Sequence, residues 1–402
     1  MADIVDMTVM RRASSRDAAA ARVRAEIVPM REPALLPLTS LDIDDWRRLA
    51  ERAIEPNGYY LPDWELAVNA TAPGRTGVSA LAAWNDSRLI GLMPVVPLSR
   101  ATQIPLPALA SAHPYGTLCT PLLDGDAAED AAQLMIQAAR NAGARALLLR
   151  EVSLDGATMK AFNRVLRGEG LRSRILNWHL RASLDATRSA DQLLQDALSG
   201  KKLKELRRQR HRLAEHGEVR FDVARSPQNV AAALETFLKL EASGWKGERG
   251  TALAQVEGNA AFIRRATRSL AENGQCEIVT LRAGDTPVAA GIVLRHQTRA
   301  FFFKIGVDER FAKYSPGVQL TLDLTRHLCA DRSIASADST ASPDHPMINP
   351  IWRGRFAIGD VLIPLKANDP VVAMIHAALI TRQTARDTAR WAVRLICARR
   401  KH

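Results

Sequence analysis

The segment 300–329 (AFFFKIGVDERFAKYSPGVQLTLDLTRHLC) contains residue types that could bind a phosphate group. A predicted strand is followed by a polar loop, and Pro316-Gly317 then opens a predicted helix. Proline suits the first helical turn, where its missing N–H would have had no partner, and Gly317 lets a ligand approach the backbone. Free N–H groups and the positive end of the helix dipole would then face an anion, with Lys313 nearby. The alternative is an ordinary strand–loop–helix joint that binds nothing.

Other catalytic signatures do not occur in the sequence. It has no G-x-x-x-x-G-K-[ST] and no G-x-G-x-x-G, which weighs against a P-loop ATPase or a dinucleotide fold. H-E-x-x-H and the G-x-S-x-G nucleophile elbow do not occur either. We interpret one H-x-x-x-D, from His327 to Asp331, as chance. The four cysteines are far apart and form no C-x-x-C pair, so we predict neither a disulfide framework nor a metal site.

These residues need α/β units to position them, and a chain of 402 residues is long enough for two or three domains. We predict a loosely ordered segment 1–40, a first unit 41–189, a basic connecting helix 190–216, a second unit 217–368 and a basic amphipathic helix 369–402. A similar hairpin pattern at 78–98 and 276–295 indicates a duplication, with two unrelated α/β units as the alternative. A last strand pair is predicted at 335–339 and 358–365.

Several blocks of the sequence resemble, in the same order, the GNAT acyltransferases, and among these the CelD-like (BioF-like) branch related to FemABX transferases. The specific blocks are Trp245-Lys246-Gly247 and Tyr314-Ser315-Pro316-Gly317, and the resemblance covers about residues 40–365. It implies an α/β (α+β) fold of two GNAT-like units in tandem, each with a mixed, mostly antiparallel sheet flanked by helices. The second unit is then expected to hold the donor. The usual GNAT signature is reduced here to Ser-Pro-Gly, which leaves aminoacyl-tRNA, used by FemABX relatives, as the alternative to acyl-CoA or acetyl-CoA.

The resemblance further implies direct transfer, in which an amine attacks a thioester carbonyl. Such a reaction needs a base, an N–H group for the oxyanion and a proton for the leaving thiolate. The candidate bases are Asp338, at the end of a predicted strand, and His345, which titrates near neutrality. Tyr314 is the candidate proton donor. The alternatives are a turn cap for Asp338, a surface loop histidine for His345 and packing under the loop for Tyr314.

The resemblance also suggests which residues bind the two substrates. Lys313, Ser315, Gly317 and Val318 are expected to bind the donor. Trp245 and Lys246 are expected to line the acceptor site or contact a phosphate, with a buried Trp beside an exposed Lys as the alternative.

The net charge of +12 comes almost entirely from two segments. Segment 201–220 holds eight Lys/Arg against three Glu, and segment 382–402 holds seven against one Asp. An anionic partner is expected at both places. The tail, with Arg382, Arg386, Arg390 and Arg394 on one helix face, is typical of a helix on an anionic membrane surface, with a solvated helix or a nucleotide-binding helix as alternatives. No aromatic residue lies among the cations of 201–212, so we expect no nucleic acid there except tRNA.

We therefore predict a bacterial, acyl-CoA-dependent N-acyltransferase that acts on an amine of a cell-envelope precursor. The acceptor would be an amino sugar of an exopolysaccharide or a sphingoid-type amino-lipid. Neither a signal peptide nor an apolar run long enough to span a membrane is found, which favours the cytoplasm and the inner face of the cytoplasmic membrane. The alternatives are a FemABX-like aminoacyl transferase and a catalytically silent GNAT module that senses an anionic ligand.

Overall fold

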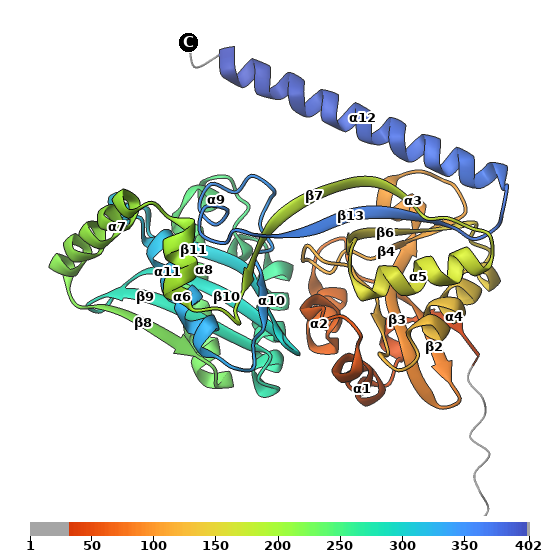
Figure 1. Ribbon diagram of the computed structural model, residues 1–402, viewed down its shortest axis with the longest axis horizontal. Helices are drawn as coiled ribbons and strands as arrows, with labels where there is room; N and C mark the ends of the chain where they lie inside the picture. The colour runs from red at the N-terminus through yellow and green to blue at the C-terminus, as the bar shows by residue number, and fades with distance from the viewer. Residues whose placement is uncertain (1–31, 400–402) are drawn as a thin grey trace, which may run out of the picture.

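The computed structural model describes residues 32–399, without the side chains of Trp245 and residues 390–399. Its strands join into one continuous mixed sheet flanked by helices (Figure 1). The strand order is β1-β2-β3-β4-β6-β13-β7-β12-β11-β10-β9-β8, and β5 pairs with β3 outside this path.

The first half of the chain forms the first unit. Its elements are β1 (Ala34–Pro37), α1 (Ile43–Arg52), α2 (Pro62–Thr71), β2 (Ser79–Asn85), β3 (Arg88–Pro97), α3 (Leu98–Thr102), β4 (Ala108–Ser111), β5 (Leu122–Leu123), α4 (Ala128–Asn141), β6 (Ala146–Ser153), α5 (Ala157–Gly168) and β7 (Arg174–Asp185). Helix α1 begins after Asp42, whose carboxylate accepts the N–H groups of Asp44 and Asp45 and so satisfies donors that the helix leaves free.

The second half contains the basic helices, the second unit and the tail. Its elements are α6 (Ala190–Ala197), α7 (Gly200–Leu213), β8 (Val219–Ala224), α8 (Pro227–Ser243), α9 (Trp245–Glu248), α10 (Glu257–Glu272), β9 (Cys276–Ala283), β10 (Thr286–His296), β11 (Arg299–Val307), the 3-10 helix η6 (Glu309–Tyr314), α11 (Pro316–Ala330), β12 (Ser336–Asp338), β13 (Gly354–Pro364) and α12 (Pro370–Arg399). The hairpins predicted at 78–98 and 276–295 are both present, as β2–β3 and β9–β10.

The two units exchange strands at the centre of the sheet. Strand β13 lies between β6 and β7, antiparallel to both, although it comes from the end of the second half. Strand β12 pairs with β11 on one side and with the end of β7 on the other. The predicted pairing of 335–339 with 358–365 is therefore wrong. The apolar pattern identified both strands, but the partner of a strand is set by tertiary packing.

Residues 34–40 are part of the fold and are not a loose segment. Strand β1 pairs antiparallel with β2, and Leu38 is fully buried. Three prolines close to this strand concealed it in the sequence, because proline is typical of loops and also of the edge strands where its missing donor is tolerated. Residues 1–31 of the predicted loose segment lie outside the described residues.

An aromatic cluster packs the two units against each other. Tyr59 and Trp64, at the start of α2, contact Phe303 of β11 edge-on, with ring centroids 6.0 and 4.9 Å away. Trp64 also contacts Phe262 of α10 at 5.1 Å. Such edge-to-face pairs contribute about 0.5–1.5 kcal/mol each beyond the area they bury. The joint is therefore a packed core and not a flexible hinge.

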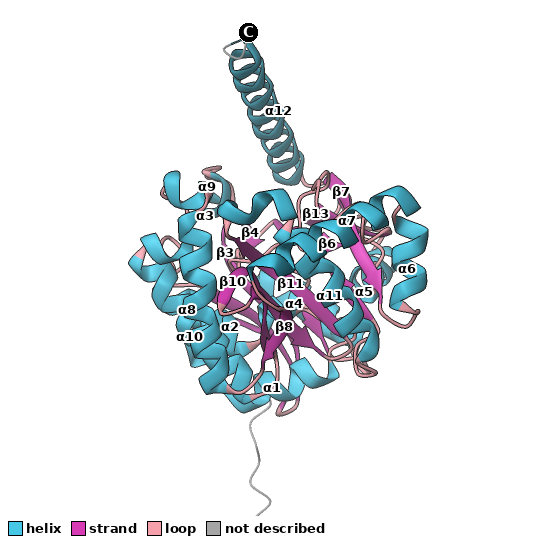
Figure 2. Cartoon of the chain, turned by 90° about the vertical axis from the view of Figure 1, so that its left-hand side faces the viewer, coloured by secondary structure: helices cyan, strands magenta, loops and turns pink. Residues whose placement is uncertain are grey.

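Helix α12 begins on the sheet and then leaves it. Val372, Ile375 and Leu379 are buried against β4, β6 and β13. Beyond them the helix extends away from the body (Figure 2), and residues 384–389 are exposed. The predicted C-terminal helix is present, and its apolar stripe covers the first unit. Arg390 and Arg394 of the predicted basic face lie outside the described side chains. In the part of the chain that the structure describes, no helix is both long and apolar enough to cross a bilayer.

Candidate active site

The predicted anion-binding joint between β11 and α11 is present. Ser315 adopts the left-handed conformation (φ 54°) and reverses the chain between η6 and the helix, and Pro316 occupies its first position. The first intrahelical bond runs from the N–H of Gln319 to the carbonyl of Ser315. Helix geometry therefore leaves the N–H groups of Gly317 and Val318 without an intrahelical acceptor. No acidic residue lies in this first turn.

Gly317 is required here by packing and not only by a ligand. A Cβ at this position would lie 3.0 Å from Sδ of Met347 and 3.2 Å from Cγ1 of Val307. The loop after β12 therefore lies directly against the start of α11. This contact places His345, two residues before Met347, close to the predicted donor site.

Lys313 and Tyr314 belong to η6, just before this joint. The Lys313 ammonium lies 4.9 Å from the centroid of the Tyr314 ring. The ring of Tyr314 is buried, and its hydroxyl lies 2.9 Å from Nε2 of His216. Tyr314 is therefore packed as the alternative interpretation expected, and its hydroxyl is also hydrogen-bonded to the side chain of His216.

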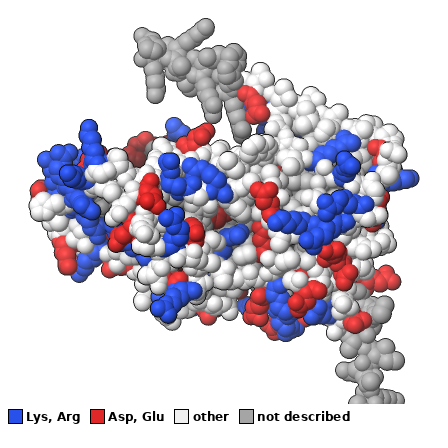
Figure 3. All heavy atoms as spheres, in the orientation of Figure 1, with Lys and Arg blue, Asp and Glu red and all other residues white. Residues whose placement is uncertain are grey.

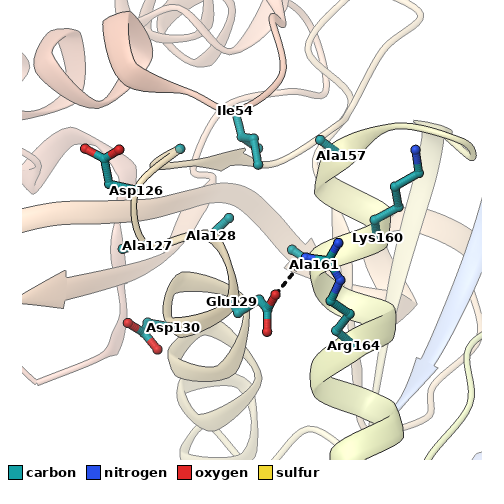
Figure 4. Close-up of a pocket in the computed structure, with 11 residues that line it drawn as sticks. Ile54, Asp126, Ala127, Ala128, Glu129, Asp130, Ala157, Lys160, Ala161 and Arg164 are labelled. Carbon is teal, nitrogen blue, oxygen red and sulfur yellow. Dashed lines mark hydrogen bonds and ion pairs between the residues drawn. The ribbon is translucent and has the colours of Figure 1, made fainter.

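The corresponding helix of the first unit has the opposite charge at its N-terminus. Helix α4 carries Glu129 and Asp130 in its first turn. They line a pocket of about 300 Å³ together with Lys160 and Arg164 of α5 (Figure 4). Arg164 donates to Glu129 at 2.8 Å, so the basic group beside this helix start is already neutralised. Carboxylates at a helix N-terminus compete with a phosphate for the dipole, which makes α11 the better anion site of the two.

Helix α7 brings further positive charge next to α11. The side-chain amide of Gln319 donates to the carbonyl of Leu206 at 2.8 Å and ties the two helices together. Figure 3 shows Lys and Arg side chains gathered over α7 at one end of the molecule. Among the described residues, its exposed side chains that form no ion pair include Lys204, Arg207 and Arg208. The basic segment recognised in the sequence therefore flanks the anion-binding joint.

Strand β11 loses its partners on both sides near Phe303. A bulge opposite Ile292 leaves Phe303 without a partner residue on β10. On the other side, β12 pairs with β11 only as far as Phe301. Beyond that point, the Thr340 hydroxyl donates to the carbonyl of Phe302 at 2.6 Å. The two central strands of the second unit therefore separate within the sheet, next to the joint at α11.

Asp338 ends β12 and is buried between the units. It forms an ion pair with Arg181 of β7, and each side chain is 1% exposed. Its other oxygen accepts the N–H of Thr340 at 2.9 Å, while Arg181 also donates to the carbonyl of Thr117 at 2.7 Å. The Tyr59 hydroxyl is buried nearby, and burial, reinforced by the charge of Asp338, raises the pKa of Tyr59. Because both of its oxygens are bound in this way, Asp338 is better suited to a positioning role than to the role of catalytic base predicted from the sequence.

A second group of charges meets beside β11. Glu241 of α8 is buried, and its Oε1 accepts from Nζ of Lys246 at 3.1 Å and from Nζ of Lys304 at 3.3 Å. Its Oε2 accepts the N–H of Leu253 at 2.9 Å. Burial lowers the pKa of Lys304, and the charge of Lys246 acts in the same direction. We call these three side chains the Glu241 cluster.

His345 adjoins this cluster. Burial, and secondly the charge of Lys246, lower the pKa of His345, so the ring is neutral near pH 7 and able to accept a proton. Of the sequence-predicted residues, Lys246 acts on His345 through its charge, and Met347 connects the loop of His345 to the joint at Gly317. Asp338 lies in a separate buried network, and the Trp245 side chain lies outside the described residues.

Sequence reasoning missed Glu241, Lys304 and Arg181 as site residues. Glu241 and Lys304 lie within the part of the chain that the resemblance covers, but nothing in their spacing showed that they touch. Arg181 occupies a strand of the first unit, and its partner Asp338 follows 157 residues later. An ion pair of this kind leaves no local pattern in the sequence.

The chain is similar to known proteins in the sequence of its second half and in its fold. Residues 200–345 match the family of acetyltransferase (GNAT) domains. The C-terminal domain of a putative lysylphosphatidylglycerol synthetase from Agrobacterium fabrum has a TM-score of 0.51 and 14% identity, over 84% of this chain and 96% of that one. FemX has a TM-score of 0.54 and 12% identity, over 84% of this chain and 98% of that one. No curated protein matches. The fold is therefore GNAT-like and shared with FemX, as a tandem of two units, which confirms the predicted fold class.

Proposed function

We propose that the chain is a GNAT-type N-acyltransferase of the CelD-like branch, which transfers an acyl group from acyl-CoA or acetyl-CoA to an amine. The observation that carries the proposal is the joint at α11, whose free N–H groups, uncharged first turn and basic surroundings suit a pyrophosphate. Next to it, β12 pairs with β11 only as far as Phe301, and we place the reacting groups beyond this point. The matching family model lies over this same part of the chain.

The reaction forms a C–N bond and breaks the C–S bond of the thioester. Lys313, Ser315, Gly317 and Val318 bind the donor, and backbone N–H groups near the bulge at Phe303 stabilise the oxyanion. His345 is neutral near pH 7 and takes the proton of the attacking amine. Tyr314, hydrogen-bonded to His216, returns a proton to the thiolate.

The acceptor is an amine of a cell-envelope precursor, either an amino sugar of an exopolysaccharide or a sphingoid-type amino-lipid. Lys246, a member of the Glu241 cluster, lines its site. Trp245, the residue before it in the sequence, is proposed to bind the acceptor as well. The chain acts at the inner face of the cytoplasmic membrane, where α12 contacts anionic lipid. The fold shared with a putative lysylphosphatidylglycerol synthetase supports an envelope substrate.

A charge placed at the start of α11 tests the donor site. We expect saturable binding of acetyl-CoA or palmitoyl-CoA by calorimetry, and Val318→Asp should weaken it at least about tenfold because a carboxylate repels the pyrophosphate. Cys329→Asp is the matched control, since both positions are half-buried on α11 against the same core but lie at opposite ends. If the wild type binds neither thioester, or if the two variants bind alike, the donor assignment is wrong.

A second candidate is aminoacyl transfer from tRNA, favoured by the exposed cations of α7 beside the same joint. Phosphate contacts by Lys and Arg make such a complex strongly salt-dependent. A tRNA complex that dissociates with rising salt and is weakened by Arg207→Gln and Arg208→Gln, in a protein that binds no acyl-CoA, would select this candidate.

A further inference from the structure

A pocket of about 250 Å³ opens in the first unit, away from the joint at α11. Its polar lining comes from Arg75, Arg100, His113 and Arg150. Arg100 donates to the carbonyls of Gly74, Thr76 and Gly77 and so fixes the loop that carries Arg75. We call it the arginine pocket.

The other two arginines of this pocket have no carboxylate partner. Among the described residues, Arg75 and Arg150 form no ion pair, and both are half-buried. Nε of Arg75 is buried without a hydrogen-bond partner. Buried charges are normally paired, because desolvation of an unpaired ion is strongly unfavourable. The pocket therefore carries positive charge that the protein itself does not neutralise.

The nearby carboxyl group of Glu65 does not provide the negative charge that the pocket lacks. Glu65 is fully buried, and neither of its oxygens has a hydrogen-bond partner. Burial raises the pKa of Glu65 well above its usual range, which disfavours the charged carboxylate. The charge of Arg75 acts against this rise without cancelling it.

His113 adds a neutral donor to the same pocket. Its Nδ1 accepts the N–H of Tyr115 at 3.0 Å, so its Nε2 carries the proton. Burial, with the charges of Arg75 and Arg150, lowers the pKa of His113 to about 4. Two guanidinium groups and an imidazole N–H can all donate hydrogen bonds to a tetrahedral oxyanion. Guanidinium groups also bind phosphate with bidentate geometry.

The arginine pocket is connected to the candidate active site through one ring. The Arg75 guanidinium lies 4.9 Å from the centroid of Tyr115, which packs on Phe262 of α10 at the same distance. The charge of Glu241 also acts on Tyr115. Tyr115 thus contacts a cation of the pocket and also experiences the charge of the Glu241 cluster.

We propose that the arginine pocket binds a phosphate group of the acceptor and holds the acceptor with its amine toward the Glu241 cluster. The placement of the amine rests on the proposed function, whereas phosphate binding does not. The phosphate belongs either to a soluble phosphomonoester or to a lipid headgroup, and both offer the same oxygens to Arg75 and Arg150.

Calorimetric titration of the full chain with inorganic phosphate and with glycerol 3-phosphate tests the pocket. We expect saturable binding that Arg150→Gln weakens at least about tenfold, since a charge-assisted contact is lost. Arg332→Gln removes the same charge from the exposed loop after α11 and should leave the affinity within about twofold. Arg75→Gln gives a second, independent removal of a pocket cation. Sedimentation with phosphatidylglycerol and phosphatidylcholine vesicles identifies the source of the phosphate. If the chain binds only the phosphatidylglycerol vesicles, and Arg150→Gln abolishes this binding, the ligand is a lipid headgroup. If no such Arg150-dependent binding occurs, the ligand is a soluble phosphomonoester.

A stability measurement separates a ligand-binding arginine from a structural one. Without phosphate, Arg150→Gln should melt at or above the wild-type temperature, because it removes an unpaired buried charge. Absence of phosphate binding, equal binding by the wild type and Arg150→Gln, or a lower melting temperature of that variant would overturn the proposal. Acyl transfer to a phosphate-free amine by a chain that binds no phosphate would leave the proposed function intact. Phosphate binding by a chain that binds neither thioester would support the arginine pocket and contradict the proposed function.

Discussion

His296 joins the two units through hydrogen bonds that only its neutral ring can make. Its Nδ1 accepts the N–H of Asn57 at 2.8 Å, and its Nε2 lies 2.9 Å from the carbonyl of Ala50, to which it donates. Burial lowers the pKa of His296 from its ordinary 6.5 to about 4, although the hydrogen bond to the carbonyl of Ala50 acts in the opposite direction. Protonation would place a proton on Nδ1, which would then face the N–H of Asn57.

The sign of the pH dependence follows from this shift. Because the pKa is lower in the folded chain than in the unfolded one, the unfolded chain binds the proton more tightly as the pH falls below 6.5. Stability is therefore complete above that value and is lost as the pH falls toward 4. Linkage gives a loss of about 2 kcal/mol from this one ring between about pH 7.5 and about pH 5.

Urea unfolding at these two pH values checks the expectation, with His296→Gln as the test and His211→Gln, on the exposed face of α7, as the control. His296→Gln should be less stable than the wild type at about pH 7.5, because it disturbs two buried hydrogen bonds, but should lose about 2 kcal/mol less on acidification. The control should behave like the wild type. If His296→Gln loses as much stability as the wild type, the proton is taken up elsewhere and the assignment is refuted.

Two further expectations concern the joint between the units. Gly116→Ala should lower the free energy of unfolding, measured in urea, by about 1–3 kcal/mol. The added Cβ would lie 2.3 Å from the ring of Tyr59, which is fixed between the units. Wild-type stability of this variant would show that the ring moves freely. Asp338→Asn should cost about 3–5 kcal/mol by the same measurement, because it leaves the buried guanidinium of Arg181 without its partner. Restoration of stability by adding Arg181→Met to that variant would confirm the pair, and a stable single variant would contradict it.

Local pattern in the sequence predicted most elements but not the way in which the strands combine. The hairpin of β9 and β10 could be predicted because a short turn fixes its register. Strand β13 could be predicted as a strand, but its neighbours come from 146–153 and 174–183, where no local signal points to it. Strand β1 was missed because its prolines are equally typical of a loop.

The candidate site shows the same division. The joint at Pro316 could be predicted because all its parts are consecutive, and its function depends on backbone N–H groups that any helix start provides. The Glu241 cluster could not, because its members come from α8, α9 and β11 and meet only after the sheet has formed. Asp338 could be predicted as a polar strand end, but not the arginine that binds it, since that arginine arrives on the exchanged strand β7.

The charge of the two units argues for a division of labour between them. Both have a helix that follows a strand of the central sheet, yet α4 begins with Glu129 and Asp130, whereas the first turn of α11 has no acid. Under the proposed function, this difference directs an anionic donor to the second unit. The first unit instead places its unpaired cations, Arg75 and Arg150, at a different pocket on the other side of Tyr115. If one ancestral unit was duplicated, the copies need not have kept the same ligand: one helix start acquired carboxylates that exclude phosphate, while the same unit acquired arginines that attract it elsewhere. Donor and acceptor could then both carry phosphate without competing for one site, because each anionic group meets its own set of donors on its own unit.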